Sequence, residues 1–438
     1  CPDSRLHDKQ ISCQLNCPSR QAINRQMTSS VQKTASEQEI ELVELDLIQM
    51  GPLGDTLADF EDQTINVFGG IEGERVVARI YRYRRHKQRI ISAMVETVLR
   101  PSEHRVATPC PYYGPCSGCQ WQHVSYEHQL ALKQEAVAAQ LREFQSLAGV
   151  TVSPTMPAPE RFNYRNHARF TVRFGGQLGF SNRITRHFAR VDECMLMGAK
   201  INEAITELQD KAGETSNLSV RVGTNTGDRL IQPTFQNSDI ALASGQKHYR
   251  ENLLGRDFKV ASPSFFQVNT AQAENLVNLV KERLELSGNE TVVDAYAGVG
   301  VFAILLAPYV ARAIAIEESS AAVSDAWENA KGLENIVFIE ARTEDALGML
   351  EEEANLQSTP DAVILDPPRV GCHPGTLDAL LELGPRRVVY VSCDPPSLAR
   401  DLDILAEGGY KVDSVEPVDM FPQTYHVECV ATMTRASL

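Results

Sequence analysis

The sequence lacks any apolar run that approaches the about 20 residues needed for a membrane helix. It also lacks a basic stretch leading into an apolar segment at its N-terminus, so no secretory signal is visible. Internal repeats and low-complexity tracts are missing too, and hydrophobic residues make up 43% of the 438. We therefore expect a globular, multidomain, cytoplasmic protein with no membrane partner, and we expect it to be a monomer.

An excess of positive charge is also missing, because the chain carries a formal net charge of −15. That balance excludes a protein that coats nucleic acid indiscriminately, although charge can be local. Two segments, 75–89 and 161–190, carry many basic and several aromatic side chains and no acidic ones. Solvated strand faces would explain one such segment, whereas two of them favour a phosphate-binding surface.

Residues 1–38 show no hydrophobic periodicity, and we expect a disordered leader there. The sequence begins with Cys1, whereas Met27 resembles a true start, so residues 1–26 are expected to be non-native. Disulfides are not expected in a cytoplasmic protein. The three leader cysteines, which are Cys1, Cys13 and Cys17, are therefore given no role.

The remaining chain divides into three predicted domains. Residues 39–100 read as short strands broken by glycine turns, which is typical of a small closed β-barrel of the oligonucleotide-binding type. Residues 101–262 contain a cysteine-rich stretch, helices near 126–144 and 201–209, and mostly antiparallel strands, which predicts an α+β domain. Residues 263–438 alternate apolar strands with helices, which predicts a Rossmann-like α/β domain with a parallel sheet covered on both faces.

Ligands of such a sheet bind beyond the carboxyl ends of its strands, and the first motif of interest lies there. Asp294 ends a predicted strand and is followed by a turn with Gly298 and Gly300, then by a helix. The spacing to Ala303 and Glu317 also fits a dinucleotide fingerprint. The acid directly before the turn favours S-adenosylmethionine, with Asp294 at its amino group and Glu317 at its ribose hydroxyls.

The second motif is Asp366-Pro367-Pro368-Arg369. Two prolines after a strand-terminal acid cannot continue the sheet, so they fix a rigid loop. We expect this loop to direct Asp366 and Arg369 into the crevice. A purely structural loop would not require the acid and the arginine that flank the prolines.

The third motif places Cys393 at the end of a strand and directly before a helix. A helix N-terminus lowers the pKa of a thiol and so favours a nucleophilic thiolate. A buried, inert thiol is the commoner fate of a cysteine, and we assign that fate to Cys372 and Cys429. The position of Cys393 favours the nucleophile.

A partner for Cys393 lies in the final predicted strand, 425–431, where His426 and Glu428 share one face at a period of two. An acid within an apolar strand tends to hold its proton more tightly. Glu428 is therefore a candidate general base.

Four cysteines of the central region form a candidate metal site. Cys110, Cys116 and Cys119 have the spacing C-x5-C-x2-C, and Cys194 follows further along the chain. Four thiolates could hold zinc or an iron–sulfur cluster. The single C-x2-C pair favours a [4Fe–4S] cluster over structural zinc, and the spacing is not that of radical S-adenosylmethionine enzymes.

Together these motifs resemble the TrmA/RumA family of RNA uracil-5 methyltransferases, in its iron–sulfur branch, from Glu39 to the end of the chain. Segments 101–106, 164–170, 178–180 and 265–269 also resemble that family. The resemblance implies a TRAM domain at residues 39–100 and a class I methyltransferase domain at 263–438. Departures from the usual pattern are Asp394 in place of Asn, Pro396 in place of Ala, and Ala297 in place of Cys.

The resemblance also implies the site residues. Cofactor contacts would come from Gln267, Tyr296, Glu317 and Asp366, the nucleophile would be Cys393, the base would be Glu428, and the cluster ligands would be Cys110, Cys116, Cys119 and Cys194. The implied reaction methylates C5 of a uridine through a covalent bond between the cysteine and C6. The target base must leave its stack. The expected substrate is 23S ribosomal RNA, with the tRNA T-loop uridine as the alternative, and the cluster is expected to have a structural or RNA-positioning role.

Three other interpretations stay open at this point. An adenine amino-methyltransferase would share an acid-Pro-Pro loop but needs no cysteine nucleophile. An NAD-linked iron–sulfur electron-transfer protein would use the glycine turn for nicotinamide, and it leaves Cys393 and Glu428 without a role. A pure RNA-binding scaffold leaves the cofactor crevice unexplained.

Overall fold

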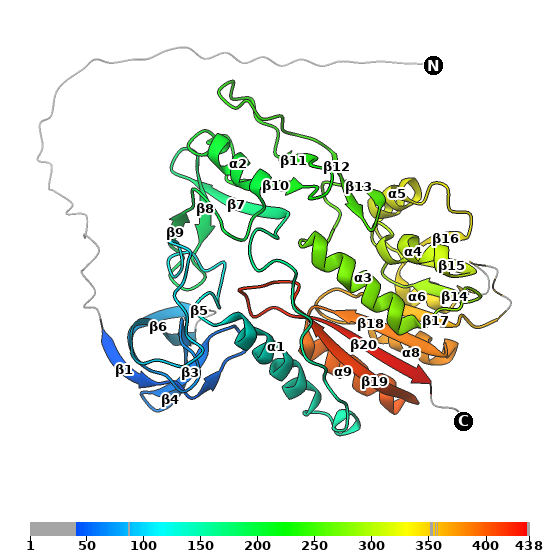
Figure 1. The fold of residues 1–438 in the computed structure, drawn as a ribbon, viewed down its shortest axis with the longest axis horizontal. Helices are drawn as coiled ribbons and strands as arrows, with labels where there is room; N and C mark the ends of the chain where they lie inside the picture. Colours follow the sequence, from blue (N-terminus) through cyan, green and yellow to red (C-terminus); the bar gives the residue numbers. More distant parts are fainter. Residues whose placement is uncertain (1–40, 86–87, 351–353, 355, 357, 436–438) are drawn as a thin grey trace, which may run out of the picture. The chain divides into compact units, whose positions relative to one another are not determined.

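The computed structural model describes residues 41–85, 88–350, 354, 356 and 358–435 (Figure 1). The chain divides into two units, Cys1–Glu41 and Leu42–Leu438, and the second contains the four sheets described below. The predicted leader, 1–38, and its three cysteines lie outside the described residues. No helix in the described part is long and apolar enough to cross a membrane.

The N-terminal sheet has the strand order β1-β5-β6-β4-β3-β2. Its strands are β1 (Leu42–Asp46), β2 (Gln49–Met50), β3 (Thr56–Phe60), β4 (Gln63–Phe68), β5 (Arg75–Arg85) and β6 (Gln88–Arg100). The two outer strands, β1 and β2, are separated only by Leu47 and Ile48, so the chain itself joins both ends of the sheet. Small and branched side chains such as Ala58, Val67 and Ala78 fill the interior. These strands therefore surround one apolar interior, as in a small barrel.

The central region contains an antiparallel sheet of order β11-β10-β7-β8-β9 and a separate hairpin, β12–β13. Its elements are α1 (Tyr126–Leu141), η1 (Gln145–Leu147), β7 (His167–Arg173), β8 (Gln177–Ser181), β9 (Phe188–Arg190), α2 (Ala199–Leu208), β10 (Asn217–Val222), β11 (Arg229–Gln232), β12 (His248–Leu253) and β13 (Arg256–Ala261). The apolar face of α2 packs on alternate residues of β7 and β10, so one face of this sheet is buried.

The C-terminal sheet has the order β16-β15-β14-β17-β18-β20-β19. Its strands are β14 (Thr291–Asp294), β15 (Arg312–Glu317), β16 (Ile336–Glu340), β17 (Ala362–Leu365), β18 (Arg387–Ser392), β19 (Tyr410–Val418) and β20 (Glu428–Arg435). The first five are parallel, as predicted, and β20 and β19 add an antiparallel edge. The predicted start of the final strand at 425 is wrong, because the strand begins at Glu428 and His426 lies in the preceding loop.

Helices cover both faces of this sheet, because its strands are apolar on both sides. They are α3 (Thr270–Leu284), α4 (Val301–Leu306), η2 (Ala307–Tyr309), α5 (Ser320–Asn329), α6 (Thr343–Leu347), α8 (Pro374–Leu383) and α9 (Pro395–Glu407). Successive residues of β14, such as Val292 and Val293, point to opposite faces of the sheet and enter two different cores. Helices α3 and α4 line one core, whereas α1, α6, α8 and α9 line the other.

The strand order reverses at β14. The chain runs from β14 to β15 and β16 on one side, then crosses to β17 and β18 on the other. Such a reversal opens a crevice at the carboxyl ends of the two strands that flank it, here β14 and β17. All three motifs of the α/β region end at this edge of the sheet.

Candidate active site

The glycine turn after β14 is built around two acids. Asp294 is buried, and its Oδ2 accepts a hydrogen bond of 3.0 Å from the Ala303 N–H. Its Oδ1 is buried without a hydrogen-bond partner among the described residues. Burial, together with the charge of Glu317, raises the pKa of Asp294 to about 7. The turn therefore begins at a buried carboxyl group whose pKa is raised.

The turn itself leaves room for a ligand. Gly298 and Gly300 both have positive φ, at 55° and 87°. A Cβ on Gly300 would lie 2.7 Å from the Ile304 side chain, whereas a Cβ on Gly298 would meet nothing within 4 Å. Glu317, at the end of β15, accepts hydrogen bonds of 2.8 Å from the N–H groups of Gly298 and Ser319. The open side of the turn therefore lies at Gly298, beside the Glu317 carboxylate.

Two further predicted cofactor residues make contacts with other segments of the chain. Tyr296 is half-buried and donates from its hydroxyl to Thr376 Oγ1 on α8 over 3.3 Å, and burial raises its pKa. Gln267 lies just before α3, and its carbonyl accepts a 3.0 Å bond from Asn166 Nδ2. The Gln267 backbone is thereby tied to the central region.

The Asp-Pro-Pro loop follows β17 directly. Its turn is closed by a 2.8 Å bond from the Gly371 N–H to the Pro368 carbonyl, and Ser397 Oγ on α9 donates to the Arg369 carbonyl over 3.1 Å. Burial and the neighbouring Asp294 raise the pKa of Asp366 to about 7. The loop thus brings a second carboxyl group with a raised pKa to the edge of the crevice.

Cys393 lies between the end of β18 and the first residue of α9. Asp394 caps α9, since its Oδ2 accepts a 3.2 Å bond from the Ser397 N–H. Burial and then the charge of Glu428 raise the pKa of Cys393 to about 11, although Arg369 opposes this. The expected lowering of this pKa is therefore wrong for the ligand-free protein, because desolvation and nearby carboxyls outweigh the helix N-terminus.

Glu428 is the first residue of β20 and lies beside Cys393, which follows the last residue of β18. Strands β18 and β20 are antiparallel with Ser392 opposite Cys429, which makes Cys393 and Glu428 neighbours. Glu428 is only 4% exposed, and burial followed by the charge of Asp366 raises its pKa well above the ordinary value, with Arg369 opposing. In the ligand-free site, burial thus raises the pKa of both the Cys393 thiol and the Glu428 carboxyl group.

Arg369 joins the two groups to the loop before β20. Its Nη2 lies 3.2 Å from His426 Nδ1, and its charge acts on both Cys393 and Glu428. Burial and Arg369 lower the pKa of His426 to about 4, so this imidazole is neutral. The two thiols that were predicted to be inert, those of Cys372 and Cys429, are buried.

Sequence reasoning missed the contacts that hold the loop before β20. Buried Lys133 of α1 donates to Asp419 and to the Phe421 carbonyl, while Gln129 exchanges two 3.0 Å bonds with Gln423. The signal was present in α1, where Gln129 and Lys133 occur at helical spacing with buried Val137 and Leu141. Their partners, however, lie almost three hundred residues away in sequence.

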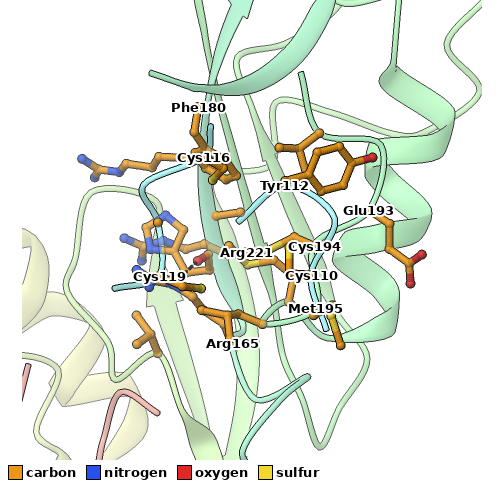
Figure 2. A pocket seen from close by; sticks show the side chains of 18 of the residues that line it. Cys110, Tyr112, Cys116, Cys119, Arg165, Phe180, Glu193, Cys194, Met195 and Arg221 are labelled. Carbon is orange, nitrogen blue, oxygen red and sulfur yellow. Dashed lines mark hydrogen bonds between the residues drawn. The ribbon is translucent and has the colours of Figure 1, made fainter. Parts of the chain in front are cut away.

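The four central cysteines line one cavity of about 550 Å³ (Figure 2). Burial, with added repulsion between the thiols, raises the pKa of Cys116 to about 11 and that of Cys119 to about 12. Gln122 Nε2 donates to Cys119 Sγ over 3.1 Å. Within the described part of the chain, no three His, Cys, Asp or Glu side chains are arranged to hold a metal ion.

Comparisons with known proteins show the family to which the chain belongs. The family model described as tRNA (Uracil-5-)-methyltransferase matches residues 249–436, which include the whole crevice. A protein of Thermosynechococcus vestitus, described as an uncharacterized RNA methyltransferase, is 31% identical over 90% of this chain and 98% of its own. The chain belongs to the tRNA (uracil-5-)-methyltransferase family.

Another relative and a solved structure of this kind of enzyme are also similar to this uracil-5 methyltransferase. A Chlorobaculum tepidum protein, also described as an uncharacterized RNA methyltransferase, is 33% identical over 83% of this chain and 90% of its own. The crystal structure of Pyrococcus abyssi tRNA (uracil-54, C5)-methyltransferase with S-adenosyl-L-homocysteine is similar with a TM-score of 0.68 and 25% identity, over 89% of this chain and 100% of that one. The protein is an S-adenosylmethionine-dependent RNA uracil-5 methyltransferase with an α/β catalytic fold.

Proposed function

We propose that Cys393 and Glu428 carry out the methyl transfer to uracil C5 by covalent catalysis. The observation that supports this most directly is their position at the adjacent ends of β18 and β20, at the edge where the glycine turn and the Asp-Pro-Pro loop also lie. Uracil C5 is a poor nucleophile, so it needs activation before it can attack a methyl group. A thiol and a carboxyl group on one side of the base supply both functions that this activation needs.

The Cys393 thiol first gives its proton to water, because burial favours the protonated form in the ligand-free site. The Cys393 thiolate adds to C6, and the electrons of the C5–C6 double bond move to form an enolate. C5 then attacks the methyl group of the sulfonium, whose sulfur leaves as a neutral thioether. The Glu428 carboxylate removes the C5 proton, the double bond re-forms, and the Cys393 thiolate is released.

The ionisation of the site fits a cationic cofactor. Asp294 and Asp366 share a raised pKa of about 7, because each is buried close to another acid. A cation placed between them favours their charged forms. We assign Gln267, Tyr296, Glu317 and Asp366 to S-adenosylmethionine, whose sulfonium supplies the methyl group.

We further propose that Cys110, Cys116, Cys119 and Cys194 hold a [4Fe–4S] cluster. Their shared cavity supports this, and so does the chemistry of four thiols. A structural role is supported by Gln120 and Trp121, whose N–H groups donate to the Gln423 carbonyl over 3.1 and 3.0 Å.

For the substrate we propose 23S ribosomal RNA, held by the N-terminal barrel as a TRAM domain and by the arginine-rich central region. A second candidate is the tRNA T-loop uridine, and the name of the Pyrococcus abyssi neighbour favours it. The monomeric state, the cytoplasmic location and the boundaries of the three domains stay predictions of the sequence.

The test is a methyl-transfer assay on a 23S ribosomal RNA fragment and on a tRNA, with 5-methyluridine measured by nucleoside mass spectrometry. We expect product on the ribosomal fragment with the wild type and none with Cys393→Ala. Product on the tRNA alone would keep the mechanism and overturn the proposed substrate. Product that persists in Cys393→Ala, or methylation of adenine, would overturn the mechanism.

A further inference from the structure

The sheet of the central region has one polar face that the proposed reaction does not use. Residues Ala168, Phe170 and Val220 point toward α2 and form its apolar core. The alternate positions on β7 and β10 therefore face the other way. There the strand register sets Arg221 opposite His167 and Arg169 opposite Ser219, and this face lines the cavity that also holds the cysteines.

Positive charge gathers on this face without ion pairs. Arg165, Arg169 and Arg221 all line the cavity (Figure 2 labels Arg165 and Arg221), and none of them forms an ion pair within the described part of the chain. Their charges converge on His167, whose pKa falls to about 3 through burial and these three guanidinium groups. The carboxylate among the described lining residues, Glu193, is exposed. The face therefore carries an excess of positive charge.

Arg221 is the most informative of the three, because it is only 5% exposed. A buried guanidinium without a carboxylate partner is costly unless an anion compensates its charge. Its Nη1 donates to the Ser264 carbonyl over 2.6 Å, which fixes the backbone beside Phe265. Phe265 also lines the cavity, yet it is 70% exposed.

This aromatic side chain lies close in sequence to Gln267, which we assign to the cofactor. Phe265 is two residues before Gln267, and Asn166, which sits next to Arg165, binds the backbone of both Gln267 and Val268. An exposed aromatic ring beside unpaired arginines is the combination that binds a phosphate and stacks an unpaired base. The proposed cluster with its four thiolates would bring negative charge to the same cavity, but it would give the exposed aromatic ring no function.

We propose that this face is a second RNA subsite, which takes one nucleotide next to the target uridine. Arg169 and Arg221 receive its phosphate, and the ring of Phe265 stacks on its unpaired base. Arg165 lies on the cysteine side of the cavity, where its charge acts on Cys194. The inference rests on the proposed function, because it takes the ligand to be part of the RNA substrate.

The test compares matched variants in an RNA-binding assay with S-adenosylhomocysteine present. The subsite variants are Arg169→Gln and Phe265→Ala. Their controls are Arg173→Gln and Phe174→Ala, which alter an exposed arginine on the same strand and an exposed aromatic residue, both outside the cavity. Iron content and cofactor affinity are measured for every variant.

We expect each subsite variant to weaken RNA binding about tenfold, with iron content and cofactor affinity unchanged. Arg169→Gln should also lower the slope of log affinity against log salt concentration by about one, as for a lost phosphate contact. Both controls should stay close to the wild type. RNA binding by the subsite variants that equals that of the wild type would overturn the subsite. Equal losses of RNA affinity in subsite and control variants would overturn it too.

This outcome can be separated from failure of the proposed function. If the wild type forms no 5-methyluridine on either transcript, the proposed function fails. RNA affinities of the same variants would still decide whether the subsite exists.

Discussion

At the scale of single residues, the reaction depends on two groups whose pKa values are raised by burial in the ligand-free protein. The position of Cys393 and Glu428 could be predicted from the sequence, because strand ends and helix starts are visible in the hydrophobic pattern. Their ionisation could not be predicted. It depends on burial and on Asp366 and Arg369, which reach the site from another strand end.

Glu428→Gln tests the role of the base. Gln cannot accept the C5 proton, so the reaction should stop at the methylated adduct, before the bond between Cys393 and C6 breaks. We expect a protein–RNA adduct that persists in denaturing gels, with turnover lowered by about 10²–10⁴-fold. Cys393→Ala/Glu428→Gln is the control and should form no adduct. An adduct in this double variant would rule out Cys393 as the attacking group.

The acids of the crevice predict a pH dependence of cofactor binding. Asp294 and Asp366 both have a pKa of about 7, so they are neutral at low pH and become charged as the pH rises through that value. Affinity for cationic S-adenosylmethionine should therefore rise relative to neutral-sulfur S-adenosylhomocysteine between about pH 6 and pH 8. One pKa unit of coupling corresponds to about a tenfold change.

Calorimetric titration of both ligands at the two pH values measures this ratio. Asp366→Asn serves as the control and should flatten its pH dependence. A ratio that stays constant in the wild type would contradict the assignment of these acids to the cofactor.

At the scale of elements, the α/β strands were predictable and the edge of the sheet was not. Strand β14 and its parallel neighbours show as apolar runs bounded by turns, whereas nothing local indicates that β19 and β20 form the antiparallel edge. The late start of β20 has a physical cause. Gln423 adopts a φ of 69° and is bound by Gln129, so the chain before Glu428 remains a loop.

The buried Lys133–Asp419 pair fixes this loop, and its removal makes a testable prediction. Lys133→Met leaves the Asp419 charge buried and unpaired, which should lower the free energy of unfolding by about 3–5 kcal/mol. The double variant Lys133→Met/Asp419→Leu should recover most of that loss, because it replaces both charges with apolar side chains. Urea denaturation of the three proteins measures the difference. If the double variant is no more stable than Lys133→Met, the loss of stability does not come from an unpaired charge on Asp419.

At the scale of the whole molecule, the loop before β20 joins separate regions of the chain. The Gln423 carbonyl accepts from Gln120 and Trp121, which follow Cys119, and Tyr164 of the central region donates to the Pro422 carbonyl over 3.1 Å. Arg183 stacks over both Phe68 of the barrel and Tyr425 of the loop. The cysteine loop and the barrel thus both contact the segment that leads into Glu428.

This connection predicts an effect of the cysteines on catalysis at a distance. Cys119→Ser should abolish bound iron and loosen the Gln120–Gln423 contact, which lowers kcat more than it raises the KM for S-adenosylmethionine. Cys17→Ser, a cysteine given no role, is the matched control. Iron analysis and steady-state kinetics provide the measurement. A folded Cys119→Ser protein with wild-type kcat would separate the cysteine loop from the active site.

The most direct test of the central claim uses RNA in which the target uridine is replaced by 5-fluorouridine. Fluorine at C5 cannot leave as a cation, so the methylated base should stay bonded to the protein. We predict that peptide mass spectrometry of the trapped complex finds one 5-methylated fluoropyrimidine nucleotide attached to Cys393. A complex attached at another residue, or methyl transfer without any covalent complex, would contradict the account.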